Sequence, residues 1–394
     1  MSAAESKTST GITVPAGFRA AGVTAGLKDS GGSDVALVVN DGPSKAAAAV
    51  FTRNRVAAAP VLWSRQAVSD GRADAVILNS GGANACTGAE GFQNTHATAE
   101  KTAALLGISA SDVLVCSTGL IGMQLPMDKL IPGVEAAAAD LSADGGLTAA
   151  QAIMTTDTVA KQAVFTGADG SFSIGGMAKG AGMLAPGLAT MLVVLTTDAD
   201  VAAPALDEAL RAATAVTFDR TDSDGCMSTN DTVILLASGA SGTVPDGDEF
   251  TRGLTEVCHS LAQQLITDAE GASHDIAITT VNAATVADAE TASRAVARSN
   301  LFKTAIFGND PNWGRVLSAV GTTDAAFEPD RIDVRINGVQ VCRNGGIGEP
   351  RESVDLAPRA VSVEIDLHAG TESATIWTND LTTDYVHENS AYSS

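Results

Sequence analysis

The sequence predicts an α/β fold of stacked sheets that helices cover. Short apolar runs rich in β-branched residues, such as residues 35–39 and 113–116, alternate with segments in which alanine and leucine recur at helical spacing. The chain has 394 residues, of which 45% are hydrophobic, so it is long enough to fill two or more core layers.

The expected elements follow one another along the chain. Glycine, aspartate and proline between the first apolar runs supply turns. Strands are expected at residues 35–39, 46–51, 75–78, 113–116, 190–195, 275–281, 332–336, 361–367 and 373–378. Helices are expected at residues 91–106, 147–154, 204–216, 250–269 and 287–297. The long helix 250–269 ends at Glu270 and Gly271, with the glycine as its C-cap.

Composition argues against several classes of function. The net charge of -22 and the pI near 4.4 disfavour nucleic acid, because phosphate binding needs clustered lysine and arginine. The first residues contain no apolar signal segment, and no apolar run approaches the roughly 18 residues of a membrane span. The five cysteines are widely spaced and form no CxxC pair. We therefore expect a cytoplasmic protein with no nucleic-acid partner and no membrane association.

The stretch from residue 179 to residue 195 suggests a nucleophile. Small residues after Lys179 lead into an apolar strand, and Thr190 stands at the joint between them. Glycine and proline just upstream allow a strained carbonyl to lie over the hydroxyl. Attack of Thr190 on the carbonyl of Ala189 would give an ester that water splits. The new α-amine, with a reference pKa of about 7.7 to 8.0, would then act as the base. An inert glycine-rich turn fits the same residues.

Three further polar features suit a catalytic site. The strand 113–116 runs into Thr118 and Gly119, whose hydroxyl and N–H can point at one oxygen atom as oxyanion donors. The cluster at residues 155–158 suits either capping or the binding of a small substrate. Glu270 opposes the dipole at a helix end, so it either faces water or meets a cation. Each feature also occurs in inert proteins.

Two motifs point to other sites and fail on context. Residues 180–185 fit G-x-G-x-x-A, and Asp200 follows at the distance of a ribose-binding acid. A dinucleotide loop must open a helix, however, and here Pro186 and a strand-like run follow. The acidic loop 218–225 is similar to a calcium loop, but Arg220 lies within it and the twelfth-position glutamate is missing. The sequence predicts neither a nucleotide site nor a metal site.

Together these motifs resemble the ornithine acetyltransferase family, also called glutamate N-acetyltransferase, over nearly the whole chain. The matching segments are residues 79–88, 117–119, 154–158, 179–192, 268–271, 308–315 and 389–392. The resemblance implies a sandwich of the αββα type, similar to that of self-cleaving aminopeptidases. It also implies cleavage between Ala189 and Thr190 into an alpha chain, 1–189, and a beta chain, 190–394. The two chains would stay together as one catalytic unit, and two such units would assemble.

The resemblance also implies roles for individual residues. Thr190 would be the nucleophile, with Thr118 and Gly119 as oxyanion donors. Substrate contacts would come from Thr156, Lys179, Thr190, Glu270, Asn389 and Ser394. Ser394 replaces a frequent terminal threonine and keeps the hydroxyl. His274 stands where lysine is commoner in the family, which leaves its role open.

The implied reaction moves acetyl from N2-acetylornithine to glutamate through an acetyl ester on Thr190. Lys179 can pair with the substrate carboxylate and Glu270 with its ammonium. Such an exchange needs neither a metal nor a nucleotide cofactor, and it leaves open whether acetyl-CoA is also a donor. Two alternatives remain. One is an N-terminal-threonine amidohydrolase or aminopeptidase that passes the acyl group to water. The other is an uncut nucleotide-binding or structural protein.

Overall fold

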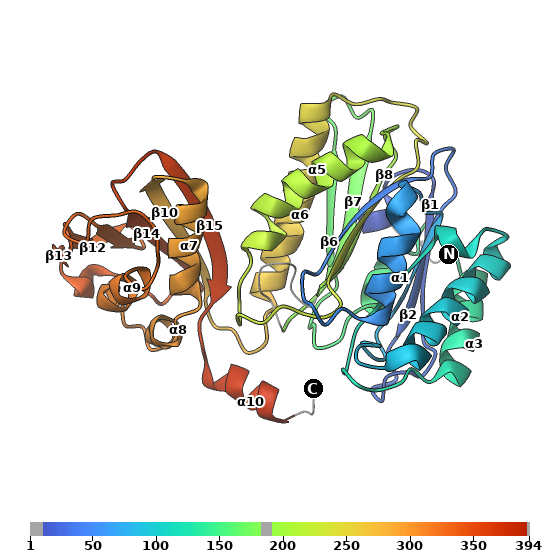
Figure 1. The fold of residues 1–394 in the computed structure, drawn as a ribbon, viewed down its shortest axis with the longest axis horizontal. Coiled ribbons are helices and arrows are strands. Elements are labelled where there is room, and N and C mark those ends of the chain that lie inside the picture. Colours follow the sequence, from blue (N-terminus) through green and yellow to red (C-terminus); the bar gives the residue numbers. More distant parts are fainter. Residues whose placement is uncertain (1–10, 183–190, 392–394) are drawn as a thin grey trace, which may run out of the picture.

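The structure, a computed structural model, describes residues 11–182 and 191–391, and their strands form three sheets (Figure 1). The first sheet runs in the order β1 (Phe18–Val23), β2 (Val35–Asn40), β4 (Ala75–Asn79) and β5 (Val113–Ser117). Its pairs are antiparallel except β4 with β5, which is parallel. Every residue of β2, β4 and β5 is buried, which is why these strands are continuous apolar runs in the sequence.

The second sheet contains the strands on either side of the predicted cleavage point. Its order is β3 (Ala46–Phe51), β9 (Thr232–Ala237), β8 (Leu192–Thr197), β7 (Ser173–Lys179) and β6 (Lys161–Thr166). β7 and β8 are antiparallel neighbours, with Lys179 opposite Leu192. The Ala189–Thr190 bond falls between these two strands, outside the described residues.

The first and second sheets stack face to face, and helices cover their outer faces (Figure 1). Val38 and Leu78 of the first sheet share one core with Val194 and Ile234 of the second. Outside the first sheet lie α2 (Gly88–Leu106) and α3 (Met127–Ala139), and outside the second lie α5 (Ala203–Val216) and α6 (Gly247–Thr267). The predicted stacked sheets flanked by helices are therefore confirmed.

Shorter helices fill the remaining edges of the sandwich. α1 (Ala59–Ala67) lies along β5, where the Ser64 hydroxyl donates to the carbonyl of Val115 at 2.7 Å. α4 (Gly146–Ala152) packs on β1 and β2 and adds its alanines to the inter-sheet core. Turns of 3₁₀ helix lie at Gly11–Thr13, Val68–Asp70, Ala110–Asp112, Phe218–Arg220 and Arg351–Ser353. No helix within residues 11–182 and 191–391 is long and apolar enough to cross a membrane.

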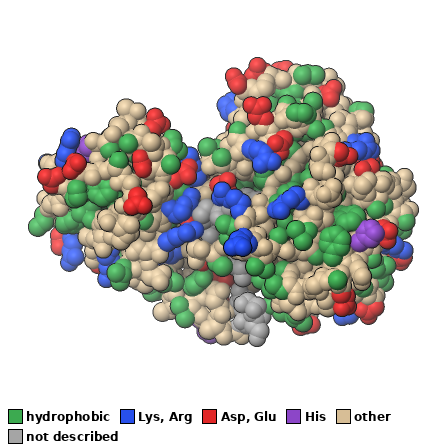
Figure 2. All heavy atoms as spheres, in the orientation of Figure 1, with side chains coloured by type: hydrophobic (Ala, Val, Ile, Leu, Met, Phe, Trp, Pro, Cys, Tyr) green, Lys and Arg blue, Asp and Glu red, His purple; other side chains and the backbone are tan. Residues whose placement is uncertain are grey.

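The third sheet lies beside the sandwich and has its own core. Its order is β13 (Gly346–Ile347), β12 (Val339–Arg343), β11 (Asp333–Ile336), β14 (Ala360–Asp366), β10 (Asp275–Ala283) and β15 (Glu372–Asn379). The helices of this part are α7 (Val286–Ala297), α8 (Asn300–Phe307) and α9 (Trp313–Val320), and side chains of all three join the core of the sheet. Figure 2 shows a hollow between this part and the sandwich, with lysine and arginine side chains gathered around it.

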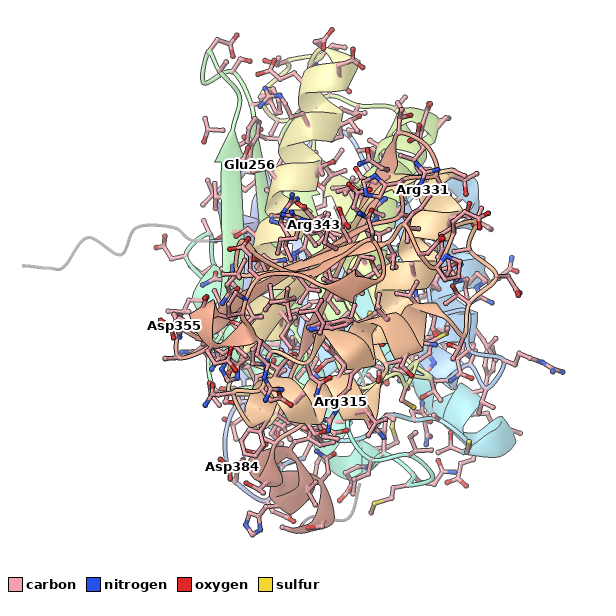
Figure 3. All side chains as sticks on the ribbon, turned by 90° about the vertical axis from the view of Figure 1, so that its left-hand side faces the viewer. Glu256, Arg315, Arg331, Arg343, Asp355 and Asp384 are labelled. Carbon is pink, nitrogen blue, oxygen red and sulfur yellow. The ribbon has the colours of Figure 1, made fainter. Side chains whose placement is uncertain are left out.

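The chain returns from the third sheet through α10 (Thr383–Ala391), which lies beneath the junction of the two parts (Figure 1). Figure 3, which views the molecule from the third-sheet side, shows Asp384 of α10 at the opposite end of the view from Arg331. This polar helix has no buried residue, and it lies at the lower edge of the view beneath the junction (Figure 1).

Several elements were not predicted from the sequence, and β7 shows why. Its two central glycines, Gly175 and Gly176, lower its strand propensity. A Cβ on Gly175 would lie 2.1 Å from the carbonyl oxygen of Gly11, and one on Gly176 would lie 2.8 Å from Leu261. These glycines therefore serve close packing on both faces of the strand. Strands β1, β6, β9, β12 and β13 and helices α1, α3, α8, α9 and α10 are likewise additions to the predicted elements.

Candidate active site

A cavity of about 460 Å³ opens where the sandwich, the end of α6 and α10 meet. The predicted residues Thr118, Gly119, Thr156, Lys179, Glu270 and Asn389 all line it. They come from loops and strand ends as far apart in sequence as residues 118 and 389, so the fold gathers them. Thr190 and Ala189, together with Ser394, lie outside the described residues.

The predicted oxyanion donors, Thr118 and Gly119, are held rigidly at the end of β5. Thr118 is buried, and its N–H donates to the carbonyl of Asn79 at 3.0 Å. Gly119 has φ of +132°, and an added Cβ would lie 2.8 Å from the backbone of Gly82. Asn230 fixes the same region, because its amide donates to the carbonyl of Ser117 at 2.8 Å. The structure thus allows only glycine after Thr118.

Lys179 lies at the end of β7 with only 2% of its surface exposed. Its Nζ donates to Thr118 Oγ1 at 3.2 Å. Burial lowers the pKa of Lys179, while the charges of Asp157, Asp231 and Glu270 act in the opposite direction. Because the Thr118 hydroxyl accepts this hydrogen bond, its own proton is free to be donated to a developing oxyanion.

The polar cluster at 155–158 is anchored by a buried ion pair. Asp157 Oδ1 accepts from Gly180 N at 2.6 Å and lies 2.7 Å from the Nζ of Lys161. Lys161 also lies 2.5 Å from Asp268 Oδ2. Burial acts to raise the pKa of Asp157, but the charges of Lys179 and Lys161 outweigh it, and the pKa is lowered to about 2. Asp157 thus fixes the start of the loop that follows β7, while Thr156 is exposed at the cavity.

Glu270 reaches the cavity from the joint between α6 and β10, residues 268–274. It is 9% exposed, and its N–H donates to the carbonyl of Ala181 at 2.9 Å. Its Oε2 accepts from Asn389 Nδ2 of α10 at 3.0 Å. A Cβ on Gly182 would come within 2.8 Å of the same carboxylate, so glycine is needed there. The carboxylate is therefore aimed into the cavity by contacts on two sides.

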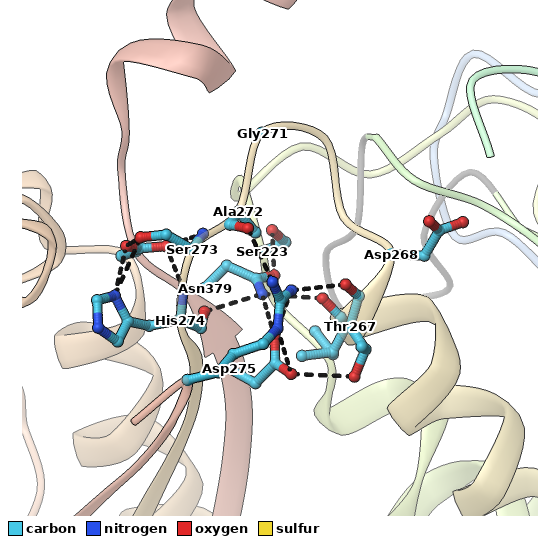
Figure 4. Close-up of polar contacts among 12 residues, drawn as sticks. Ser223, Thr267, Asp268, Gly271, Ala272, Ser273, His274, Asp275 and Asn379 are labelled. Carbon is cyan, nitrogen blue, oxygen red and sulfur yellow. Dashed lines mark hydrogen bonds and ion pairs between the residues drawn. The ribbon is translucent and has the colours of Figure 1, made fainter. Parts of the chain in front are cut away.

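Figure 4 shows how the joint is fastened to the third sheet. Asn379 Nδ2 donates to the carbonyls of Ile266 and His274, at 2.9 and 3.2 Å. His274 Nδ1 lies 2.8 Å from Asp380 Oδ2, and its Nε2 lies 3.0 Å from the carbonyl oxygen of Leu356. His274 is absent from the residues that line the cavity. It holds the segment that follows Glu270 in place.

Other lining residues were missed by reasoning from the sequence. They are Ala83, Leu120, Ile121, Gly182, Asp224, Cys226, Ser228, Thr229, Asn230 and Tyr385, whereas Thr155 belongs to the predicted cluster 155–158. Burial raises the pKa of Tyr385 to about 12, with the charges of Asp224 and Glu270 acting in the same direction. A signal was present for part of this set, since polar residues 228–231 lead directly into the buried strand β9. Nothing local indicated that this loop faces Thr118.

The geometry suits a small amide substrate that carries both charges. A buried cation, Lys179, lies beside the predicted oxyanion donors, and a carboxylate, Glu270, lines the same cavity. A ligand with a carboxylate and an ammonium at its ends would be oriented by these two groups. Its carbonyl would then face Thr118 and Gly119.

Comparisons with known proteins identify the family of the chain. Residues 19–394 match the ArgJ family. An arginine biosynthesis bifunctional protein ArgJ of Streptomyces coelicolor is 67% identical over 383 residues, which cover 97% of this chain and 100% of the relative. A protein of the same name from Thermobifida fusca is 65% identical over 382 residues, or 97% of this chain and 99% of the relative.

Among solved structures, ornithine acetyltransferase complexed with ornithine from Mycobacterium tuberculosis is 57% identical. The match covers 46% of this chain and 96% of that chain, with a TM-score of 0.44. The family match spans far more than half of the sequence, and the relatives align over almost their whole length. The chain therefore belongs to the ArgJ family.

Proposed function

We propose that this chain is a glutamate N-acetyltransferase of arginine biosynthesis that takes acetyl from N2-acetylornithine and gives it to glutamate. The observation that carries the proposal is the single cavity lined by Thr118, Gly119, Lys179 and Glu270. The family and the names of its relatives support the same reaction.

Acetylornithine is bound through its two charged ends. Its carboxylate pairs with Lys179, and its side-chain ammonium pairs with Glu270, whose carboxylate is steadied by Asn389. Thr156 and the terminal Ser394 add polar contacts. This binding leaves the acetyl carbonyl near the oxyanion donors, where a positioned nucleophile gains most from proximity.

Thr190 carries out the transfer. Its Oγ attacks the acetyl carbonyl while its own α-amine accepts the proton, and the oxyanion rests on Thr118 and Gly119. The C–N bond then breaks, the amine returns the proton to the leaving ornithine nitrogen, and acetyl remains as an ester on Thr190. The α-amine of glutamate attacks this ester by the reverse steps. No metal or nucleotide cofactor enters these steps.

The free α-amine of Thr190 arises from self-cleavage after Ala189, which gives chains 1–189 and 190–394. Strands β3, β6 and β7 come from the first segment, and β8 and β9 come from the second. Because these strands share one hydrogen-bonded sheet, the two chains would stay associated. We further propose that two such alpha–beta units assemble in the cytoplasm, and that acetyl-CoA is a second donor, which suits relatives named bifunctional.

The test is a donor and acceptor screen on the purified protein. Denaturing mass spectrometry should give two chains that meet at Ala189 and Thr190. Labelled acetyl should pass from acetylornithine to glutamate, and digestion after trapping should place the label on Thr190. Ornithine release that is indifferent to glutamate would instead identify a hydrolase. A fully active enzyme with an intact chain would refute the nucleophile assignment.

A further inference from the structure

Self-cleavage cannot use the proton acceptor that serves in acetyl transfer. Before the Ala189–Thr190 bond breaks, the nitrogen of Thr190 belongs to an amide, which is not basic. The α-amine that serves as the base in transfer therefore does not yet exist. Some other group of the chain must accept the hydroxyl proton of Thr190.

Asp231 is a buried carboxyl group that the transfer steps do not use. It directly precedes β9, none of its surface is exposed, and its Oδ1 accepts a hydrogen bond from the N–H of Met191 at 3.1 Å. Met191 follows Thr190 in the chain, so two bonds of about 1.33 and 1.52 Å connect Met191 N to the Cα of Thr190. The hydrogen bond thus anchors the carboxyl group at Met191, the residue bonded directly to Thr190.

The second oxygen of this carboxyl group is unsatisfied. Asp231 Oδ2 is buried and has no hydrogen-bond partner among the residues that the structure describes. A buried polar atom without a partner is costly, and a catalytic role is one reason for which such an atom is retained. The free oxygen is available to accept a proton.

The surroundings of Asp231 make it a stronger base than an exposed aspartate. Burial raises the pKa of Asp231, against the opposing effects of the Met191 N–H, of the nearby Ser228 and of the charge on Lys179. Lys179 is the other buried titratable group nearby. Its Nζ is already engaged as a donor to Thr118 Oγ1, where it serves the oxyanion pair.

We propose that Asp231 is the proton acceptor for self-cleavage, a role that rests on the proposed function of Thr190. The ionised Asp231 accepts the proton from Thr190 Oγ as the oxygen bonds to the carbonyl carbon of Ala189. The bond from that carbon to the nitrogen of Thr190 then breaks, and the proton passes from Asp231 to the nitrogen. Water adds to the resulting ester, Thr190 Oγ leaves with a proton, and a carboxylate remains on Ala189. Asp231 is regenerated.

The test follows cleavage of the full-length chain during cell-free synthesis. Labelled chains are chased over time at several pH values, and the precursor and its two products are separated by denaturing electrophoresis and weighed by mass spectrometry. The variant is Asp231→Asn, which keeps an oxygen for the N–H of Met191. The matched control is Asp198→Asn at the other end of β8, whose carboxyl also accepts a backbone hydrogen bond, from Ser173 N at 2.7 Å.

A positioned general base contributes about 10² to 10⁴ in rate, so Asp231→Asn should slow cleavage by at least about 100-fold. The Asp198→Asn chain should be cut at nearly the wild-type rate. The wild-type rate should rise with pH, and that dependence should disappear in Asp231→Asn. The small fraction of Asp231→Asn that does cut should transfer acetyl at close to the wild-type rate per cut chain, because its α-amine is then free.

Three results would overturn the role of Asp231. The first is cleavage of Asp231→Asn at close to the wild-type rate, and the second is slow cleavage that keeps the wild-type pH profile. The third applies if Asp231→Asn does not fold: Asp231→Glu, which retains a carboxylate, would then also fail to restore pH-dependent cleavage. Failure of the proposed function looks different. In that case Thr190→Ala would still be cut, or the cut wild-type protein would move no acetyl.

Discussion

At the scale of single residues, the proposed chemistry of the site depends on the hydrogen bonds of the Thr118 hydroxyl. Lys179 donates to Thr118 Oγ1, and a hydroxyl that accepts one hydrogen bond is a better donor in the next. In the proposed mechanism, the buried ammonium would therefore act on the oxyanion through Thr118 as well as on the substrate carboxylate. The charges of Asp157, Asp231 and Glu270 favour the ammonium of this lysine, which is only 2% exposed at the end of a core strand.

Removing the Thr118 hydroxyl should slow both reactions at the site. We expect Thr118→Val to reduce the rates of self-cleavage and of acetyl transfer by about 10² to 10³, the usual loss of one oxyanion donor. Thr118→Ser keeps the hydroxyl and should stay within about tenfold of wild type. The rates are measured by the labelled-chain chase and by transfer kinetics. Equal rates for Thr118→Val and Thr118→Ser would contradict the assignment.

Glu270→Gln separates recognition of the ammonium from chemistry. Losing a charged hydrogen bond costs about 1.5 to 3 kcal/mol, so the KM for acetylornithine should rise about 10- to 100-fold with little change in kcat. Glutamate has no side-chain ammonium and provides the internal control, since its KM should not rise. Steady-state kinetics with each substrate varied give both values. A parallel rise for glutamate would assign Glu270 a general structural role instead.

At the scale of elements, the terminal helix completes the site. α10 brings Asn389 to Glu270 and Tyr385 to the cavity wall, and it is seated on the joint by Thr382, whose hydroxyl donates to the carbonyl of Gly271 at 2.6 Å. Gly271 has φ of +61°, and a Cβ there would lie 2.2 Å from Tyr385 N. The seat of α10 is therefore a close approach of two backbones.

Gly271→Ala should unseat α10 and weaken substrate binding. The added methyl group collides with backbone, so Asn389 should separate from Glu270 and the KM for acetylornithine should rise about tenfold, as for loss of one charged hydrogen bond. Gly338→Ala is the matched control, because its φ of +84° is also positive but no atom lies within 4 Å of an added Cβ. Kinetics and limited proteolysis of the C-terminal segment compare the two. Equal behaviour would contradict the seating role.

At the scale of the whole molecule, a buried ion pair near the cavity also contributes to the stability of the sandwich. The Asp157 and Lys161 pair joins the loop before β6 to the end of β7, and Asp268 extends it to the end of α6. The pKa of Asp157 is lowered to about 2, so the folded state holds this carboxylate ionised below the pH at which the unfolded chain protonates it. Its stabilisation is complete at neutral pH and is lost as the pH falls from about 4 toward 2.

The pH dependence of the stability of Asp157→Asn tests whether this carboxylate stabilises the fold at neutral pH and not in acid. A depression of nearly two pKa units corresponds to about 2 kcal/mol, so at pH 7 the variant should be less stable by at least that amount. The difference in the free energy of unfolding between the variant and the wild type should narrow as the pH approaches 2. Urea denaturation followed by tryptophan fluorescence measures it. Asp207→Asn, which breaks an exposed pair with Arg211, is the control and should change stability by about 1 kcal/mol or less at every pH. A constant gap for Asp157→Asn would contradict the linkage.

By itself, the sequence determined the elements whose burial is periodic or continuous. Local patterns predicted the strand 113–116 and the helix 250–269. The motifs, taken in their order along the chain, identified the family. They also pointed to Thr118, Lys179, Glu270 and Asn389, which share one cavity. The assignment of Thr190 as nucleophile stays a prediction.

Only the tertiary structure decided which distant segments meet. The glycine-rich strand β7, the separate core of the third sheet and the seat of α10 depend on contacts between segments far apart in the chain. Asp231 and Asn230 are ordinary polar residues in the sequence, and they became informative once their neighbours were known. The physical reason is that periodicity records whether a side chain is buried, whereas the identity of its partner is set by sheet register and by the packing of layers.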